Sequence, residues 1–185
     1  MKPEVMTASG NYFNFEDPDP DSFSIEDIAY ALSNTCRYGG HCKPFYSVAQ
    51  HCVYVSHHVP AGFALHALLH DAQEAFVGDI PSPLKRMLPE FKIIEKRCEE
   101  AVMRKFNVHD SIESYTRVKE ADLIALRSER EVLLPKGEEG DAWWWVVEEG
   151  IEISDQPIVP LFPDEAEALF LGRFEEIMYL EKRYG

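Results

Sequence analysis

The sequence predicts an all-α protein built from helices packed on one core. In several long segments apolar residues recur every three or four positions, which is the spacing of helices with one buried face. Most prolines and glycines fall between these segments. The chain has 185 residues, 45% of them hydrophobic, which is enough for one packed core. We therefore expect residues 1–185 to form a single helical domain, with short irregular or hairpin additions at the termini.

The first 23 residues precede the predicted helices. The segment "EDPDPDSF" is too rich in proline and acid for a helix or a central strand, whereas "NYFNF" before it fits a short strand or an arm. Ser24 fits a helix N-cap, with Asp27 three residues later as a weak capping box. A helix is therefore expected over about residues 25–33, with Ile28 and Leu32 on its apolar side.

Further helices are predicted along the rest of the chain, separated by turns that contain glycine or proline. Trp143, Trp144 and Trp145 are expected to pack against the helical core, because tryptophan brings a large apolar area. The predicted helices span about residues 47–57, 63–77, 89–106 and 112–134, and a last one is capped by Asp164.

The composition excludes several classes of function. A formal net charge of -15 disfavours a groove for long nucleic acid, but local cations can still hold a small anion. No apolar run approaches the roughly 20 residues that span a bilayer, and the N-terminus lacks the order of a signal peptide. We expect a cytoplasmic protein, and its cysteines, which form no CxxC pair, should be free thiols.

Three ionisable residues interrupt the apolar face of the predicted helix over residues 63–77. His70 and Glu74 are four residues apart, and Asp71 and Glu74 three apart, so all three lie on neighbouring positions of one face. Leucines and alanines around them indicate that this face points inward. Burial of such groups costs several kcal/mol unless they are paired or bound to a metal. Histidine nitrogen and aspartate oxygen suit Mn²⁺, Zn²⁺, Co²⁺ or Fe²⁺.

Two more polar residues occupy positions that should be buried. His51 lies among the valines of "YSVAQHCVYV", and Asp122 lies within the apolar stretch "KEADLIAL". Each sits on a different predicted helix from His70 and Asp71. These residues are candidates for further ligands of the same ion.

The strings "FYSVAQHC", "LLHDAQEAFVGDIPSPLK" and "KEADL" together resemble the HD-domain metal-dependent phosphohydrolases. The resemblance is strongest to the small HD nucleotidases of bacteria, phages and prophages, a branch that includes 5′-deoxynucleotidases and phage deoxynucleoside triphosphate hydrolases. It covers about residues 24–134 and implies an HD-domain helical bundle. Carried over by position, it implies that His51, His70, Asp71 and Asp122 hold one divalent ion (Co, Mn, Zn, Mg or Fe).

The resemblance also implies roles for other residues. Glu74 matches the proton-transfer acid of the family, and Asp79 in "GDIPSP" matches a second acid of the motif. His41 lies in the loop that is expected to cover the substrate. The positions expected to contact phosphate are Arg37, Lys85 and Lys119.

Three functions remain open at this point. The first is hydrolysis of the 5′ phosphate ester of deoxynucleoside monophosphates. The second uses the same residues to release triphosphate from deoxynucleoside triphosphates. The third is a non-catalytic protein that binds nucleotides. The resemblance further implies a homo-oligomer and, for a phage-encoded protein, location in the host cytoplasm.

Overall fold

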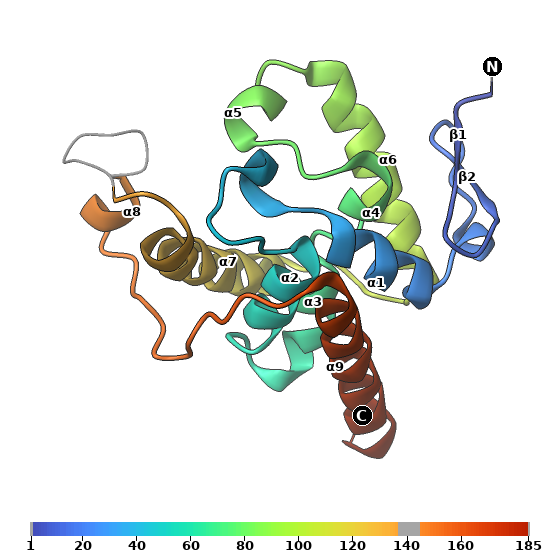
Figure 1. The fold of residues 1–185 in the computed structure, drawn as a ribbon. Helices are drawn as coiled ribbons and strands as arrows, with labels where there is room; N and C mark the ends of the chain where they lie inside the picture. Colours follow the sequence, from blue (N-terminus) through green and yellow to red (C-terminus); the bar gives the residue numbers. More distant parts are fainter. Residues whose placement is uncertain (1, 137–144, 185) are drawn as a thin grey trace.

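The computed structural model describes residues 2–136 and 145–184 as a bundle of helices with a small hairpin at the N-terminal end (Figure 1). The predicted all-α class is confirmed. The elements are β1 (Glu4–Met6), β2 (Tyr12–Asn14), η1 (Pro20–Ser22), α1 (Ile25–Asn34), η2 (Arg37–Gly40), α2 (Val48–Ser56), η3 (Ala61–Phe63), α3 (Ala64–Leu69), α4 (Glu74–Val77), α5 (Ser82–Lys85), α6 (Pro89–Lys105), α7 (Ile112–Leu133), α8 (Trp145–Glu148) and α9 (Pro163–Tyr184), where η marks a 3-10 helix.

The hairpin is fixed to the bundle by one aromatic side chain and one carboxylate. β1 and β2 pair antiparallel, and Phe13 is fully buried with its ring stacked on that of Phe76, 3.8 Å between centroids. Asp27 accepts hydrogen bonds from the amide and the hydroxyl of Ser9 at 2.7 and 2.9 Å. The predicted capping box is present, since Ser24 and Asp27 bond to each other's backbone amides.

α2 is the central helix, and α1, α3, α7 and α9 all pack against it (Figure 1). Every residue of α2 is buried. This short helix is therefore largely apolar on all sides and has no separate polar face. The polar residues that it carries are therefore placed inside the protein. No helix among residues 2–136 and 145–184 is both long and apolar enough to cross a membrane.

The continuous helix predicted over residues 63–77 is wrong. The chain forms α3, then a tight turn over residues 70–73, then α4. In the turn the backbone bonds shorten to three-residue spacing, as in Ala72 N to Leu69 O at 3.0 Å. The Nδ1 atom of His70 lies 2.8 Å from Ala67 O, the carbonyl to which an α-helix would bond the amide of Asp71. The contact of the His70 side chain with Ala67 O therefore replaces a backbone hydrogen bond of the helix.

The last helix also begins two residues earlier than predicted, since a cap at Asp164 places its first residue at 165. Pro163 occupies its first turn, where the missing amide hydrogen costs nothing, and Glu165 accepts a hydrogen bond from the amide of Phe162 at 2.9 Å. Asp164 is therefore inside the helix and does not cap it. The packing predicted for the side chains of residues 143–145 lies outside the part of the chain that the structure describes.

Candidate metal centre

Three of the four predicted metal ligands meet where α2 faces the turn after α3. His51 is on α2, and His70 and Asp71 begin the turn. Oδ2 of Asp71 lies 3.6 Å from Nε2 of His51 and 3.2 Å from Nε2 of His70. One potential ligand atom from each residue lies within 4.8 Å of the other two. The break in the predicted helix directs both side chains of the His70–Asp71 pair to the same point.

The imidazole nitrogens of this cluster fit a metal ion. Nε2 of His51 and Nε2 of His70 are buried, and neither has a hydrogen-bond partner. Buried polar atoms are paired in most native proteins, and an unpaired one needs an explanation. On each ring the other nitrogen is already taken, by Glu129 for His51 and by a backbone oxygen for His70. This arrangement leaves both Nε2 atoms available as ligands.

Asp122 stands beside this cluster but slightly apart. Its Oδ1 is 3.4 Å from Nε2 of His51, so α7 contributes a second carboxylate to the same nitrogen. Its Oδ2 accepts a hydrogen bond from Nζ of Lys119 at 2.6 Å. Asp122 therefore already has a cationic partner, one turn earlier on its own helix.

The charges around the cluster favour a cation. Burial lowers the pKa of His70, but the adjacent Asp71 carboxylate more than offsets this, and the pKa is well above its usual range. Burial raises the pKa of Asp122, yet the contact with His51 and the charge of Lys119 hold it well below the usual range. The negative potential that favours a protonated imidazole also favours a divalent ion.

Comparison with known proteins decides the family. A family model described as "5'-deoxynucleotidase YfbR-like" matches residues 45–131. The uncharacterized protein YfdR of Escherichia coli K12 is 42% identical over 179 residues, which cover 96% of this chain and 97% of that protein. The chain belongs to the YfbR-like family of HD-domain phosphohydrolases. An uncharacterized protein of Rhodobacter capsulatus is 30% identical over 135 residues, 66% of this chain and 69% of that protein.

HD-domain proteins of the YfbR-like family are metal-dependent, in agreement with the cluster of His51, His70 and Asp71. The matched segment also contains Asp122 and the acids and lysines that the sequence singles out after residue 70. Arg37 and His41 precede it. The structure brings Arg37 to the cluster nevertheless, with Nη1 3.9 Å from Oδ2 of Asp71.

Glu74 lies at the start of α4, one turn beyond His70. Only 3% of the residue is exposed, and its Oε2 is buried without a hydrogen-bond partner. Its Oε1 accepts a hydrogen bond from Nζ of Lys85 at 3.2 Å. Burial first, and then the charges of Asp71 and Asp79, raise the pKa of Glu74 well above its usual range. The carboxyl group of Glu74 therefore gives up its proton at a higher pH than an exposed glutamate does.

Lys85 is held by acids from two helices. Besides Glu74, it donates a hydrogen bond to Oε1 of Glu95 on α6 at 2.5 Å. Burial lowers the pKa of Lys85, but the charges of Glu74 and Glu95 more than offset this and bring the pKa above its usual value. The ammonium is therefore charged. Glu95 does not stand out in the sequence, because it lies among the charges of "IIEKRCEE".

The other predicted residues lie around this cluster. Asp79, half-buried after α4, is placed close enough for its charge to act on both Glu74 and Arg37. His41 ends the η2 turn that carries Arg37, and its side chain is exposed. His66, one turn before His70, lies outside the three-residue cluster, and its Nε2 is 3.4 Å from Oδ1 of Asp110.

Glu129 is the main residue that sequence reasoning misses. It is fully buried on α7, and its Oε1 is 2.7 Å from Nδ1 of His51. Its Oε2 accepts hydrogen bonds from Nε of Arg37 at 3.0 Å and from the hydroxyl of Tyr38 at 2.6 Å. Burial raises the pKa of Glu129, but the charge of Arg37 and the contact with His51 lower it below its usual value. The available signal is its spacing of seven residues, two helical turns, from Asp122.

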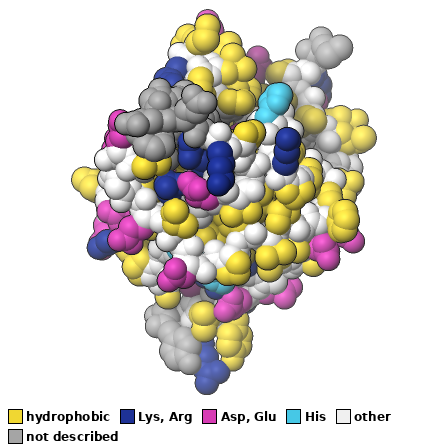
Figure 2. Space-filling view, turned by 60° about the vertical axis from the view of Figure 1, so that its left-hand side comes forward, with side chains coloured by type: hydrophobic (Ala, Val, Ile, Leu, Met, Phe, Trp, Pro, Cys, Tyr) yellow, Lys and Arg dark blue, Asp and Glu magenta, His cyan; other side chains and the backbone are white. Residues whose placement is uncertain are grey.

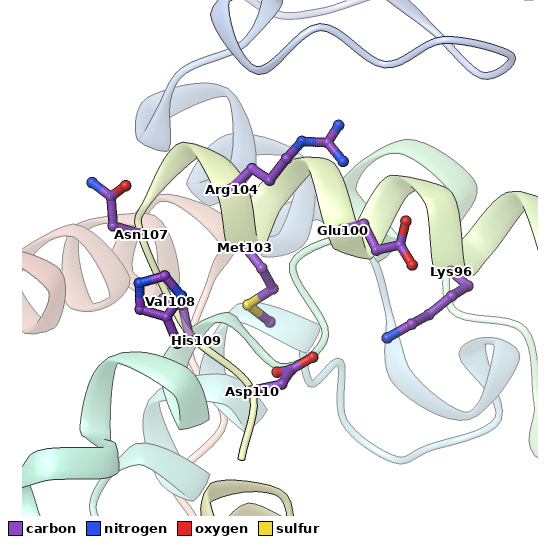
Figure 3. A pocket seen from close by; sticks show the side chains of 8 residues that line it. All are labelled: Lys96, Glu100, Met103, Arg104, Asn107, Val108, His109 and Asp110. Atoms are coloured by element: carbon purple, nitrogen blue, oxygen red, sulfur yellow. The ribbon is translucent and has the colours of Figure 1, made fainter.

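A hollow of about 350 Å³ lies elsewhere, at the C-terminal end of α6 (Figure 3). Figure 3 shows Met103 pointing from α6 toward Asp110, whereas the end of Arg104 lies on the other side of the helix. The hollow contains none of the predicted metal or substrate residues. Its lining is shared among Lys96, Glu100, Met103, Arg104, Asn107, Val108, His109 and Asp110.

Proposed function

We propose that this protein is a metal-dependent phosphohydrolase that cleaves the 5′ phosphate ester of deoxynucleoside monophosphates. The observation that carries the proposal is the pair of buried, unpartnered Nε2 atoms of His51 and His70 that converge on Asp71. Together with membership of the YfbR-like family, this pair supports a catalytic ion over an incidental group of polar residues.

In this proposal His51, His70, Asp71 and Asp122 hold one divalent ion, which is Co, Mn, Zn, Mg or Fe. Such an ion lowers the pKa of a bound water and polarises a phosphoryl group. Lys119 donates a hydrogen bond to Oδ2 of Asp122. A cation held by Asp122 would weaken the attraction of that carboxylate for Lys119, so the ammonium would be available for a phosphate oxygen.

Arg37 is the cation best placed for the reacting phosphate. Its side chain is only 10% exposed, and the guanidinium stays charged at any physiological pH. Glu129 accepts a hydrogen bond from Nε of Arg37, so Nη1 remains directed to Asp71 in the candidate metal centre. Lys85 supports the same phosphate in the proposal, and to reach it the ammonium has to leave Glu74 or Glu95.

Glu74 is assigned the proton transfer. The alkoxide that leaves the phosphorus needs a proton, and a buried carboxyl group with a raised pKa is a better proton donor than an exposed glutamate near neutral pH. Asp79 acts through its charge, which raises the pKa of Glu74. His41 is assigned to the nucleoside side of the substrate because it ends the η2 turn. Assembly as a homo-oligomer and location in the cytoplasm remain predictions.

The test is a panel of deoxynucleoside mono-, di- and triphosphates, each assayed with Mn²⁺, Co²⁺, Zn²⁺ and Mg²⁺. The proposal expects inorganic phosphate from monophosphates and no activity after chelation. Triphosphate as the main product, with a higher kcat/KM than for the monophosphate, would replace the proposal by a triphosphohydrolase. Nucleotide binding without any turnover would indicate a non-catalytic protein.

Two arginine variants test which residues contact the phosphates of the substrate. Arg37→Ala should cost about 1.5–3 kcal/mol in kcat/KM for every substrate, as expected for a lost charge-assisted hydrogen bond. Arg86 is exposed at the end of α5, so Arg86→Ala should change the monophosphate kcat/KM little. A larger loss for triphosphates than for monophosphates in Arg86→Ala would indicate that this residue holds a phosphate tail.

A further inference from the structure

The carboxylate of Glu129 contacts both a predicted metal ligand and a predicted phosphate-binding residue. Glu129 reaches His51 through one oxygen, and Arg37 and Tyr38 through the other, at 2.7, 3.0 and 2.6 Å. These partners come from two elements of the fold, α2 and the η2 turn, and Glu129 on α7 connects them. A purely structural ion pair needs only one cationic partner, whereas this carboxylate serves a predicted ligand and a predicted phosphate contact together.

The contact with His51 determines which ring nitrogen is free. A carboxylate oxygen only accepts hydrogen bonds, so the Nδ1 atom that faces Glu129 carries a hydrogen. In the neutral ring the lone pair is then on Nε2, the atom that faces Asp71 and Asp122. Glu129 therefore sets both the tautomer and the direction of the ring.

The contact with Arg37 determines which part of the guanidinium faces the cluster. Glu129 occupies Nε, which leaves Nη1 directed at Asp71, 3.9 Å away. The next residue, Tyr38, has a φ of 58°, a left-handed conformation that is unfavourable for a bulky side chain. The bond from the Tyr38 hydroxyl to Glu129 holds the turn in this conformation.

We propose that Glu129 is a positioning residue that aligns the metal ligand His51 with the phosphate contact Arg37. The part that concerns Arg37 rests on the proposed function, because it assumes a phosphate substrate. The part that concerns His51 does not, because the tautomer and the metal affinity are measured without substrate.

The first experiment is long-range ¹H–¹⁵N NMR on the chelated wild-type protein at alkaline pH, with His51→Gln to assign the His51 signals. The inference expects the His51 proton on Nδ1. A proton on Nε2 would overturn it. This measurement needs no change at Glu129, so it decides the matter even if a variant at that position does not fold.

The second experiment compares Glu129→Gln with Glu131→Gln on the same helix. Gln has nearly the shape of Glu, but its amide can donate to Nδ1 of His51 and move the proton to Nε2. We expect the affinity for Mn²⁺ or Co²⁺ to fall about 10–100-fold in Glu129→Gln, as for other partners of metal-bound histidine. Glu131 is 40% exposed and paired with Arg127, so Glu131→Gln should leave the metal affinity unchanged.

The third measurement is kinetic. At saturating metal, Glu129→Gln should still raise KM for a deoxynucleoside monophosphate, because a neutral amide oxygen holds the Arg37 guanidinium less strongly than a carboxylate does. Unchanged metal affinity would overturn the His51 part, and unchanged KM would overturn the Arg37 part. A protein that shows the Nδ1 proton and the loss of metal affinity, but hydrolyses no nucleotide, would retain this inference while the proposed function fails.

Discussion

Lys85 is the residue whose removal tests the acid network of the site most directly. Its ammonium donates to Glu74 at 3.2 Å and to Glu95 at 2.5 Å, and the side chains of these acids are 4% and 16% exposed. Lys85→Met keeps the length of the side chain and removes the charge. Both acids then lose the cation to which they are hydrogen-bonded.

The size of the effect follows from these contacts. Two charge-assisted hydrogen bonds are lost, each worth about 1.5–3 kcal/mol. Part of this is recovered, because Glu74, whose pKa is already raised by burial, can take up a proton, and Glu95 can turn toward water. We expect a net loss of about 2 kcal/mol in the free energy of unfolding, smaller than for a fully buried pair that loses one partner. For a domain of this size the loss lowers Tm by about 4–8 °C.

Urea unfolding in the presence of a chelator measures this loss without a contribution from metal binding. Lys92→Met, at an exposed position on α6, is the matched control and should have almost no effect. Glu74→Gln added to Lys85→Met should recover stability, because it removes the buried acid that lost its partner. If Lys85→Met were as stable as Lys92→Met, or if Glu74→Gln added a further loss, the reasoning would be wrong.

Three further outcomes are expected. His70→Ala and Asp71→Ala should lose bound metal and activity together, and a full equivalent of metal at wild-type affinity in either variant would remove that residue from the ligand set. Glu74→Gln should keep its metal in a metal titration while kcat falls about 10²-fold or more. Burial raises the pKa of Asp27, but hydrogen bonds from Ser9 bring it below the usual 3.8. Asp27 therefore stabilises the folded state fully above pH 3.8, and this contribution is lost as the pH falls through the lowered pKa of the folded protein. The difference in unfolding free energy between the wild type and Asp27→Asn should therefore shrink in acid.

The sequence predicts the helices well because their apolar faces are regular. The capping box of Ser24 and Asp27 and the start of α7 at Ile112 follow from local patterns alone. The break after Leu69 does not, because the apolar spacing continues through it. The backbone is redirected there by the contact of His70 with Ala67 O, and such a side-chain contact leaves no trace in the periodicity.

The candidate site is predictable where a polar residue interrupts an apolar segment, as at His51 and Asp122. It is not predictable where a buried charge lies in a charged segment. Glu129 stands between Ser128 and Arg130 in "RSEREVLL", which is typical of a solvated helix face. Its burial depends on α2 and the η2 turn, which are far away in the sequence.

The pairing of charges is compatible with the proposed binding of a phosphate by a chain with a net charge of -15. Figure 2 shows Lys and Arg side chains gathered on one face with an acidic side chain among them, so positive potential is local. Within the site, Lys85 and Lys119 are each bonded through the ammonium to a carboxylate, whereas Arg37 is bonded to Glu129 through Nε and keeps Nη1 for another partner. A phosphate that meets Arg37 first breaks no hydrogen bond to an acid, because Nη1 lies 3.9 Å from Asp71. A cation bound at Asp122 then weakens the hold of that acid on Lys119, so metal and phosphate should each strengthen the binding of the other.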